Sequence, residues 1–147
     1  LGMMQKDNRT IAFVCTGNTC RSPMAEAIFN DMAEKNGVCV RAESFGIATS
    51  TGLPESENSV IACKEIGIDL SGKASTAVAD AGIEKYEKFY CMSQSHAKML
   101  MQFFLVQPEK IAVLGISDPY GGDIDVYRHC RDEIVNSVKE ILKAYEN

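Results

Sequence analysis

Long hydrophobic runs are missing from this sequence of 147 residues. The longest apolar stretches, residues 11–15 and 99–106, fall far short of the roughly 20 apolar residues that a membrane-spanning helix needs. No signal-peptide core lies near the N-terminus. We therefore expect a soluble, cytoplasmic protein without a membrane partner.

A concentrated basic region is also missing. Lysine and arginine together number 15 against 20 aspartates and glutamates, which gives a net charge of −5, and the basic residues are scattered along the chain. A nucleic-acid-binding protein usually gathers them into a patch. The G-x-x-x-x-G-K-[ST] and G-x-G-x-x-G motifs are absent as well, so we expect neither a nucleic acid nor a nucleotide as partner.

Metal-ligand spacing is absent too. The six cysteines include no C-x-x-C pair, and His96 and His129 have no partner at ligand spacing. We expect no metal and no cofactor, and we predict that both histidines lie on helix surfaces. Without a signal peptide, the cysteines should be mostly reduced thiols.

The chain length fits one domain. Residues 10–147 contain no internal repeat, low-complexity segment or shift in composition that would separate a second domain. We interpret residues 1–9 as a flexible lead-in, in which Leu1-Gly2 ahead of Met3 is typical of a remnant of recombinant expression. The sequence leaves the oligomeric state open.

Strand-like and helix-like segments alternate along residues 10–147. Strand-forming residues predict strands at residues 10–15, 38–45, 89–92 and 111–114. Apolar residues at helical spacing predict helices at residues 24–35, 54–66, 95–106 and 126–145. This alternation predicts an α/β fold, a three-layer sandwich in which a four-stranded parallel sheet has helices on both faces. Ligands bind at the carboxyl ends of the strands in such sheets, and Cys15 ends the first strand.

The most informative segment is the loop that follows this first strand. It reads Cys15-Thr16-Gly17-Asn18-Thr19-Cys20-Arg21-Ser22. The inward-pointing N–H groups of such a loop, together with the N-terminus of the next helix, can bind a phosphate dianion. Arg21 adds a planar guanidinium that can hold two phosphate oxygens. We therefore predict a phosphate-binding loop after strand 1 that includes every residue from Thr16 to Ser22.

Cys15 is the predicted nucleophile. A thiol at a helix N-terminus beside a fixed positive charge has a lowered pKa, so we expect Cys15 to be largely a thiolate at neutral pH. Ser22 can donate its hydroxyl to that thiolate and can also serve as the N-cap of the helix that Pro23 opens; the N-cap role alone needs no catalysis. A cysteine and an arginine at this spacing can occur by chance, but the strand, the Gly-Asn turn and the helix start around them favour chemistry.

Residues 15–26 resemble the signature of the low-molecular-weight protein phosphatase family, and the similarity covers nearly the whole chain. The late Asp118-Pro119-Tyr120 matches the family's second motif. The resemblance implies that Cys15 attacks phosphorus to form a cysteinyl-phosphate, with Arg21 as phosphate clamp. It also implies that Asp118 protonates the leaving group and then activates water, two roles that one carboxyl can fill in turn. By itself, Asp-Pro indicates only a turn.

The residue before the second loop cysteine indicates the substrate. Family members that act on phosphotyrosine resemble one another in having a bulky aliphatic residue there, whereas the bacterial protein arginine phosphatases have threonine, as this chain does at Thr19. The resemblance therefore implies phosphorylated proteins or peptides as partners, with phosphoarginine ahead of phosphotyrosine. Tyr120, where that subgroup would have phenylalanine, is a second candidate specificity residue.

Two other functions share this loop. Thioredoxin-coupled arsenate reductases resemble it but need two further redox cysteines, and although Cys91 lies near the relevant region, position 98 is Lys98. A phosphoprotein-binding module would use Arg21 without turnover.

Cys20 allows a further hypothesis, a reversible disulfide with Cys15 under oxidant, although it can equally be a buried packing residue. We assign to the core the sulfur and aromatic side chains in and just before the third predicted helix (residues 95–106): Met92, Met99, Met101, Phe103 and Phe104.

Overall fold

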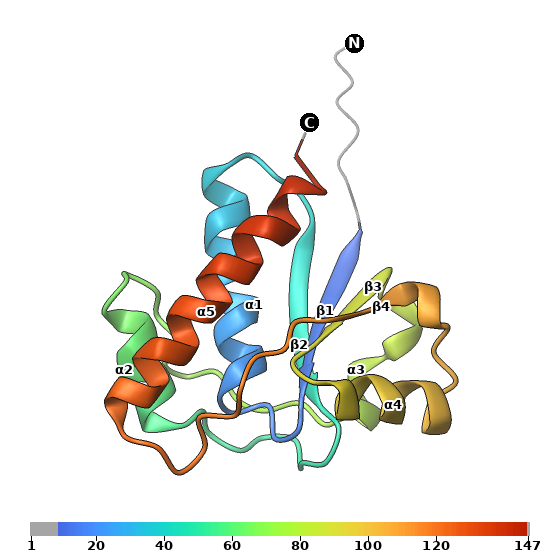
Figure 1. Cartoon of the computed structure of the whole chain (residues 1–147), viewed down its shortest axis with the longest axis horizontal. Coiled ribbons are helices and arrows are strands. Elements are labelled where there is room, and N and C mark those ends of the chain that lie inside the picture. Colours follow the sequence, from blue (N-terminus) through green and yellow to red (C-terminus); the bar gives the residue numbers. More distant parts are fainter. Residues whose placement is uncertain (1–8, 147) are drawn as a thin grey trace.

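Four parallel strands form the central sheet of the computed structural model, which describes residues 9–146 (Figure 1). The strands are β1 (Thr10–Cys15), β2 (Arg41–Gly46), β3 (Lys88–Cys91) and β4 (Ile111–Val113). Their spatial order is β2-β1-β3-β4, and every neighbouring pair is parallel. The predicted α/β class and four-stranded parallel sheet are confirmed. The lead-in expected at residues 1–9 lies outside the described residues except for Arg9.

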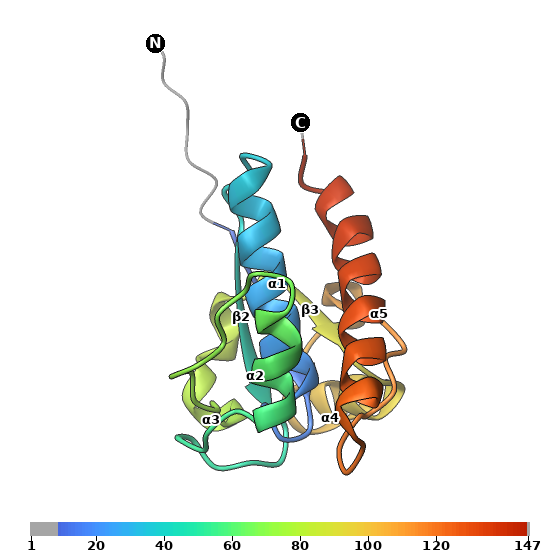
Figure 2. The same cartoon turned by 90° about the vertical axis from the view of Figure 1, so that its left-hand side faces the viewer.

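Helices cover both faces of the sheet, as Figures 1 and 2 show. They are α1 (Arg21–Lys35), α2 (Glu57–Lys64), α3 (Val78–Ala81), α4 (Gln94–Phe103) and α5 (Ile124–Lys143). Helices α1 and α5 pack together on one face, with α2 against both, while α3 and α4 lie on the other. The three-layer sandwich is therefore confirmed as well. None of the helices in the described chain is long and apolar enough to cross a membrane.

The alternation of side chains along β1 divides the core in two. Ile11, Phe13 and Cys15 face the layer of α1 and α5, whereas Ala12 and Val14 face that of α3 and α4. All five are buried, because β1 lies between two strands and under helices on both sides. Cys15 thus ends a rigid central strand.

Several element boundaries differ from the predictions. The first helix begins at Arg21 rather than at residue 24, and Ser22 lies inside it, so its predicted N-cap role is wrong. The second strand begins only at Arg41, because the N–H of Val38 still bonds the helical carbonyl of Ala33. Helix α3 and the 3-10 turns Ile83–Lys85 and Pro108–Lys110 were not predicted.

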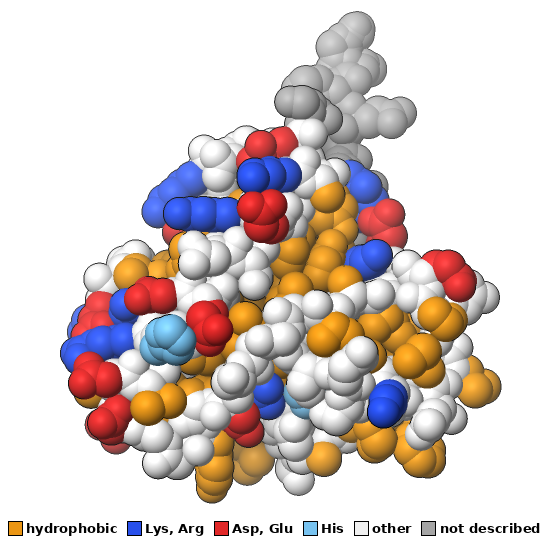
Figure 3. All heavy atoms as spheres, in the orientation of Figure 1, with side chains coloured by type: hydrophobic (Ala, Val, Ile, Leu, Met, Phe, Trp, Pro, Cys, Tyr) orange, Lys and Arg blue, Asp and Glu red, His pale blue; other side chains and the backbone are white. Residues whose placement is uncertain are grey.

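Helix α4, which corresponds to the predicted helix at residues 95–106, is less buried than expected. It ends at Phe103, and Leu105 follows with a left-handed φ of 57°. Met92 is fully buried, but Met99 and Phe103 are exposed, so their assignment to the core is wrong. In the space-filling view of Figure 3, apolar side chains likewise reach the surface among charges of both signs.

Candidate active site

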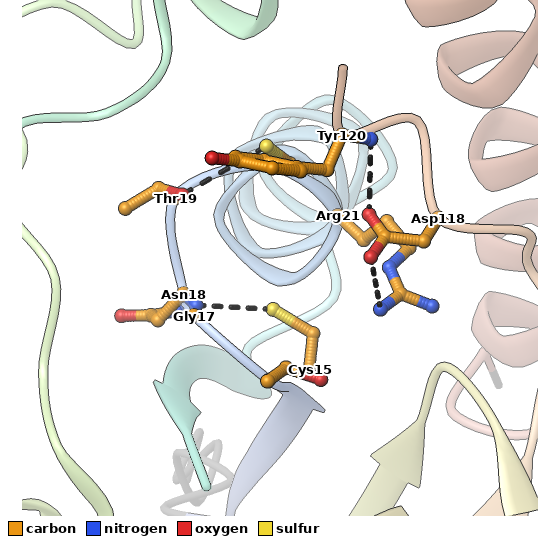
Figure 4. A pocket seen from close by; sticks show the side chains of 9 residues that line it. Cys15, Gly17, Asn18, Thr19, Arg21, Asp118 and Tyr120 are labelled. Carbon is orange, nitrogen blue, oxygen red and sulfur yellow. Dashed lines mark hydrogen bonds and ion pairs between the residues drawn. The ribbon is translucent and has the colours of Figure 1, made fainter. Parts of the chain in front are cut away.

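The predicted loop borders a cavity of about 270 Å³ at the carboxyl edge of the sheet. Figure 4 shows Cys15 at the end of β1, Arg21 at the start of α1, and Asp118 and Tyr120 reaching over from the segment between β4 and α5. The lining consists of Cys15, Thr16, Gly17, Asn18, Thr19, Cys20, Arg21, Asp118 and Tyr120. Of the predicted catalytic, phosphate-binding and specificity residues, only Ser22 is not on this lining. Two segments that are distant in sequence, residues 15–21 and residues 118–120, therefore meet around one thiol.

The Cys15 thiol is 3% exposed and is surrounded by hydrogen-bond donors. The Ser22 hydroxyl lies 2.8 Å from the Cys15 sulfur, and the N–H of Asn18 donates to that sulfur at 3.2 Å. Asn18 has a left-handed φ of 55°, which turns its amide back toward the strand end. Donors in this arrangement favour an anion, either a thiolate or a bound phosphoryl group.

Asn18 also fixes the direction of the Ser22 hydroxyl. Its side-chain amide donates to the Ser22 oxygen at 2.8 Å and to the Ser44 oxygen at 2.9 Å. Because Asn18 occupies a lone pair of Ser22, the Ser22 proton is free to point at the Cys15 sulfur. The Ser44 hydroxyl in turn donates to Glu26 at 2.6 Å. Sequence reasoning missed Ser44 and gave Glu26 no role, since no local pattern shows that β2 brings Ser44 beside the loop.

The predicted lowering of the Cys15 pKa is not supported. Burial makes the largest contribution and raises the pKa of the thiol above its ordinary value. Hydrogen bonds from Ser22 and from the amide of Asn18, and the charge of Arg21, act in the opposite direction without overcoming burial. The loop therefore stabilises the thiolate relative to an equally buried thiol without such donors.

Arg21 is held from two sides. Its side chain is almost fully buried, and it donates to the carbonyl of Ile116 at 2.9 Å. Its other terminal nitrogen lies 3.7 Å from a carboxylate oxygen of Asp118. The Asp118 side chain is 54% exposed, and its second oxygen accepts from the N–H of Tyr120 at 3.1 Å. A carboxyl group thus lies at the rim of the cavity, accessible to a leaving group and to water, and the largely exposed Tyr120 side chain lies at the mouth.

His96 contradicts its predicted surface position. It is 3% exposed, whereas the side chain of His129 is 79% exposed as expected. One ring nitrogen of His96 lies 2.9 Å from the hydroxyl of Thr16, and the other accepts from the N–H of Ser93 at 3.1 Å. Burial, followed by the charge of Arg21, lowers the pKa of His96 to about 4. Its position at the start of a helix was visible in the sequence, but its burial under the loop was not.

Cys20 contacts residues of the two helical segments beside the loop. Its sulfur lies 3.4 Å from the hydroxyl of Tyr127 and 3.5 Å from that of Ser56. All six cysteines are free thiols in the described structure, so a disulfide between Cys15 and Cys20 stays a hypothesis. Residues 9–146 hold no cluster of three or more His, Cys, Asp or Glu side chains arranged for a metal ion.

A thiol, a guanidinium and a carboxyl around an anion-binding loop on this fold define a cysteine-based phosphatase of the low-molecular-weight class. Comparison with known proteins agrees, because the family described as low molecular weight phosphotyrosine protein phosphatase matches residues 10–147. The chain belongs to this family, whose members are hydrolases of phosphorylated proteins. The resemblance that residues 15–26 carry is therefore confirmed.

Relatives with three different names are similar to this chain. The protein-arginine-phosphatase of Bacillus subtilis is 33% identical, with 90% of this chain and 94% of the relative covered. An arsenate reductase of Brevibacillus brevis is 30% identical, with 96% and 99% covered. A solved structure of a low molecular weight protein tyrosine phosphatase from T. tengcongensis has a TM-score of 0.88 at 31% identity, covering 93% of this chain and 99% of that one. Overall similarity alone therefore does not choose the substrate.

Proposed function

We propose that this protein removes phosphoryl groups from arginine side chains of proteins, with Cys15 as nucleophile. The observation that carries the proposal is that Cys15, Arg21 and Asp118 line one cavity, in which the thiol lies at the bottom and the carboxyl at the rim. The remaining loop residues supply backbone donors to the phosphoryl oxygens, as phosphate-binding loops do. These roles are the ones that the sequence predicted.

The reaction has two steps. In the first, the Cys15 sulfur attacks phosphorus, the bond from phosphorus to the leaving nitrogen breaks, and Asp118 gives that nitrogen a proton. In the second, Asp118 takes a proton from water, the water oxygen attacks phosphorus, and the bond from phosphorus to sulfur breaks to release inorganic phosphate and the thiolate. Arg21 and the loop amides stabilise the negative charge that the three non-bridging oxygens carry in both transition states.

Polar groups around the cavity favour a guanidinium leaving group. Thr19 presents a hydroxyl where phosphotyrosine-specific members have an aliphatic side chain, and its oxygen is close to the neighbouring Cys20 sulfur at 3.8 Å. The exposed half of Asp118 can pair with a cationic leaving group as well as protonate it. The similarity to protein-arginine-phosphatases from Bacillus subtilis and Geobacillus stearothermophilus, at 33% and 34% identity, supports the same substrate.

The second candidate is a protein tyrosine phosphatase. Tyr120 favours it, because this ring is 82% exposed at the mouth of the cavity and can stack on an aromatic substrate. An arsenate reductase is less well supported, since Cys91 is fully buried and packs on the face of the sheet opposite to Cys15. A thiol there would need the strand to move before it could reach Cys15.

Rates on two peptides test the substrate. We expect kcat/KM for a phosphoarginine peptide to exceed that for the matching phosphotyrosine peptide, and Thr19→Ile to weaken or reverse this order, because an isoleucine packs on a flat ring but offers no hydroxyl. Thr10→Val, at the other end of β1, is the matched control. Equal or faster hydrolysis of phosphotyrosine by the unmodified protein would contradict the arginine assignment.

We also propose that residues 10–147 form one domain and that the protein works in the bacterial cytoplasm. A nucleophilic thiol such as Cys15 needs a compartment that keeps thiols reduced. The similarity to proteins from Bacillus and Geobacillus supports a bacterial source.

A further inference from the structure

Thr16 and His96 form a polar pair at the edge of the cavity. Thr16 follows β1 and His96 lies in the first turn of α4, directly after β3, so the pair joins the ends of two adjacent strands. The Thr16 oxygen lies 2.9 Å from the Nε2 atom of His96. Thr16 is exposed and lines the cavity, whereas His96 is buried behind it. A buried group thus holds an exposed hydroxyl in place.

The contacts of His96 determine which atom of the pair donates. The N–H of Ser93 can only donate, and it donates to the Nδ1 atom of His96 at 3.1 Å, so Nδ1 carries no proton. Because burial keeps this imidazole neutral, its single proton is on Nε2. His96 therefore donates to Thr16, and one lone pair of the Thr16 oxygen is occupied.

The Thr16 hydroxyl then has one proton and one lone pair left. Because Thr16 is exposed and lines the cavity, both are available to a ligand there, where the loop amides would hold a phosphoryl group. A hydroxyl fixed in this way suits a ligand in which an acceptor and a donor are neighbours. The phosphoryl oxygen and the N–H next to phosphorus in a phosphoramidate are such neighbours.

We propose that Thr16, held by His96, is a specificity-determining residue that favours a phosphoryl group bonded to nitrogen over one bonded to oxygen. This inference rests on the proposed function and adds a second hydroxyl to that of Thr19. Thr16 donates to a phosphoryl oxygen and accepts from the guanidinium N–H, whereas a phosphate ester has no N–H and leaves this acceptor unused. His96 is the positioning residue, since it does not line the cavity itself.

The test compares kcat/KM for a phosphoarginine peptide and for para-nitrophenyl phosphate. We expect Thr16→Val to lower the ratio of the two values about tenfold, as for the loss of one hydrogen bond, and Thr16→Ser to restore most of it. His96→Asn keeps an acceptor for the N–H of Ser93 but is too short to reach Thr16, and should reproduce the change in ratio. The double variant Thr16→Val with His96→Asn should change the ratio no further than either single variant, since both substitutions remove the same interaction.

Each outcome decides between the claims. If Thr16→Val changes both substrates equally, or changes neither, the specificity role is overturned while phosphoarginine hydrolysis by the unmodified protein still supports the proposed function. Additive effects of Thr16→Val and His96→Asn would overturn the positioning role of His96. If the unmodified protein hydrolyses para-nitrophenyl phosphate but not phosphoarginine, the proposed function fails and this inference with it. Thr10→Val is again the matched control, and circular dichroism verifies that each variant is folded.

Discussion

Two influences of opposite sign act on the thiol of Cys15. Burial at the end of a central strand raises its pKa, whereas the hydroxyl of Ser22, the N–H of Asn18 and the charge of Arg21 lower it. Asn18 and Arg21 also line the cavity, so we expect them to stabilise the oxygens of a bound phosphoryl group as well as the thiolate. On the proposed mechanism, the thiolate and the phosphoryl group would share one anion site.

A second buried titratable residue, Glu55, lies just before α2. It is 9% exposed, and neither of its carboxylate oxygens has a hydrogen-bond partner within residues 9–146. Burial raises its pKa from 4.5 to about 8, with Lys73 opposing the shift and Glu26 adding to it. The next residue, Ser56, donates its N–H to the carbonyl of Thr19 at 3.0 Å, so Glu55 adjoins the segment that supports the phosphate loop.

Glu55 should make the protein less stable as the pH rises. Below about pH 4.5 the Glu55 carboxyl is protonated in both the folded and the unfolded chain. Between about pH 4.5 and 8 the unfolded chain releases this proton while the folded chain keeps it. The free energy of unfolding therefore falls as the pH rises through this range. We expect Glu55→Gln to remove this dependence and to raise the free energy of unfolding by roughly 2–4 kcal/mol at pH 8, with a much smaller gain at pH 5. Urea unfolding of both proteins at pH 5 and pH 8 measures this difference in the free energy of unfolding. An equal effect at both would mean that Glu55 does not titrate in this range.

At the scale of elements, the end of β2 supports the phosphate loop by backbone contact. The N–H groups of Ile47 and Ala48 donate to the carbonyls of Cys15 and Thr16, both at 3.0 Å. A Cβ atom on Gly46 would lie 2.6 Å from the carbonyl oxygen of Thr16, which is closer than real contacts allow. Glycine at this position therefore lets strand and loop approach each other.

Gly46→Ala should displace the loop. We expect kcat/KM to fall at least tenfold and the free energy of unfolding to fall by about 1–3 kcal/mol, the usual cost of overpacking. Gly37→Ala is the control: Gly37 has a left-handed φ of 70° and open space around it, so the substitution should cost about 1 kcal/mol of stability and spare the activity. Loss of activity in the control but not in Gly46→Ala would show that the contact is unimportant.

Some elements could be predicted from sequence because local signals define them. Asp123 caps α5 by accepting from the N–H of Val126 at 3.1 Å, and periodic apolar residues identified that helix to within two residues at each end. The short α3 has no such signal, since four residues cannot establish a period. The signal at Ser22 was misleading. A serine before proline is typical of a helix N-cap, but here the Ser22 hydroxyl contacts Cys15 and Asn18.

At the scale of the whole molecule, the site could be predicted where its residues are contiguous. The predicted nucleophile, the loop amides and Arg21 all lie in one segment, residues 15–22, and the Asp-Pro-Tyr motif indicated Asp118. The contributions of Ser44, Glu26 and His96 depend on which strands are neighbours and which way side chains face. Those facts follow from the order β2-β1-β3-β4, which the sequence pattern did not specify.

The central claim is that Cys15 carries the phosphoryl group between two steps, the second of which needs Asp118. An Asp118→Asn variant treated with para-nitrophenyl phosphate tests it, because this leaving group departs without a proton while water is no longer activated. After rapid acid quenching, we predict that mass spectrometry finds one added phosphoryl group on the peptide that contains Cys15, and none when Cys15→Ala is added. A phosphoryl group on another residue, or turnover that survives Cys15→Ala, would contradict the account.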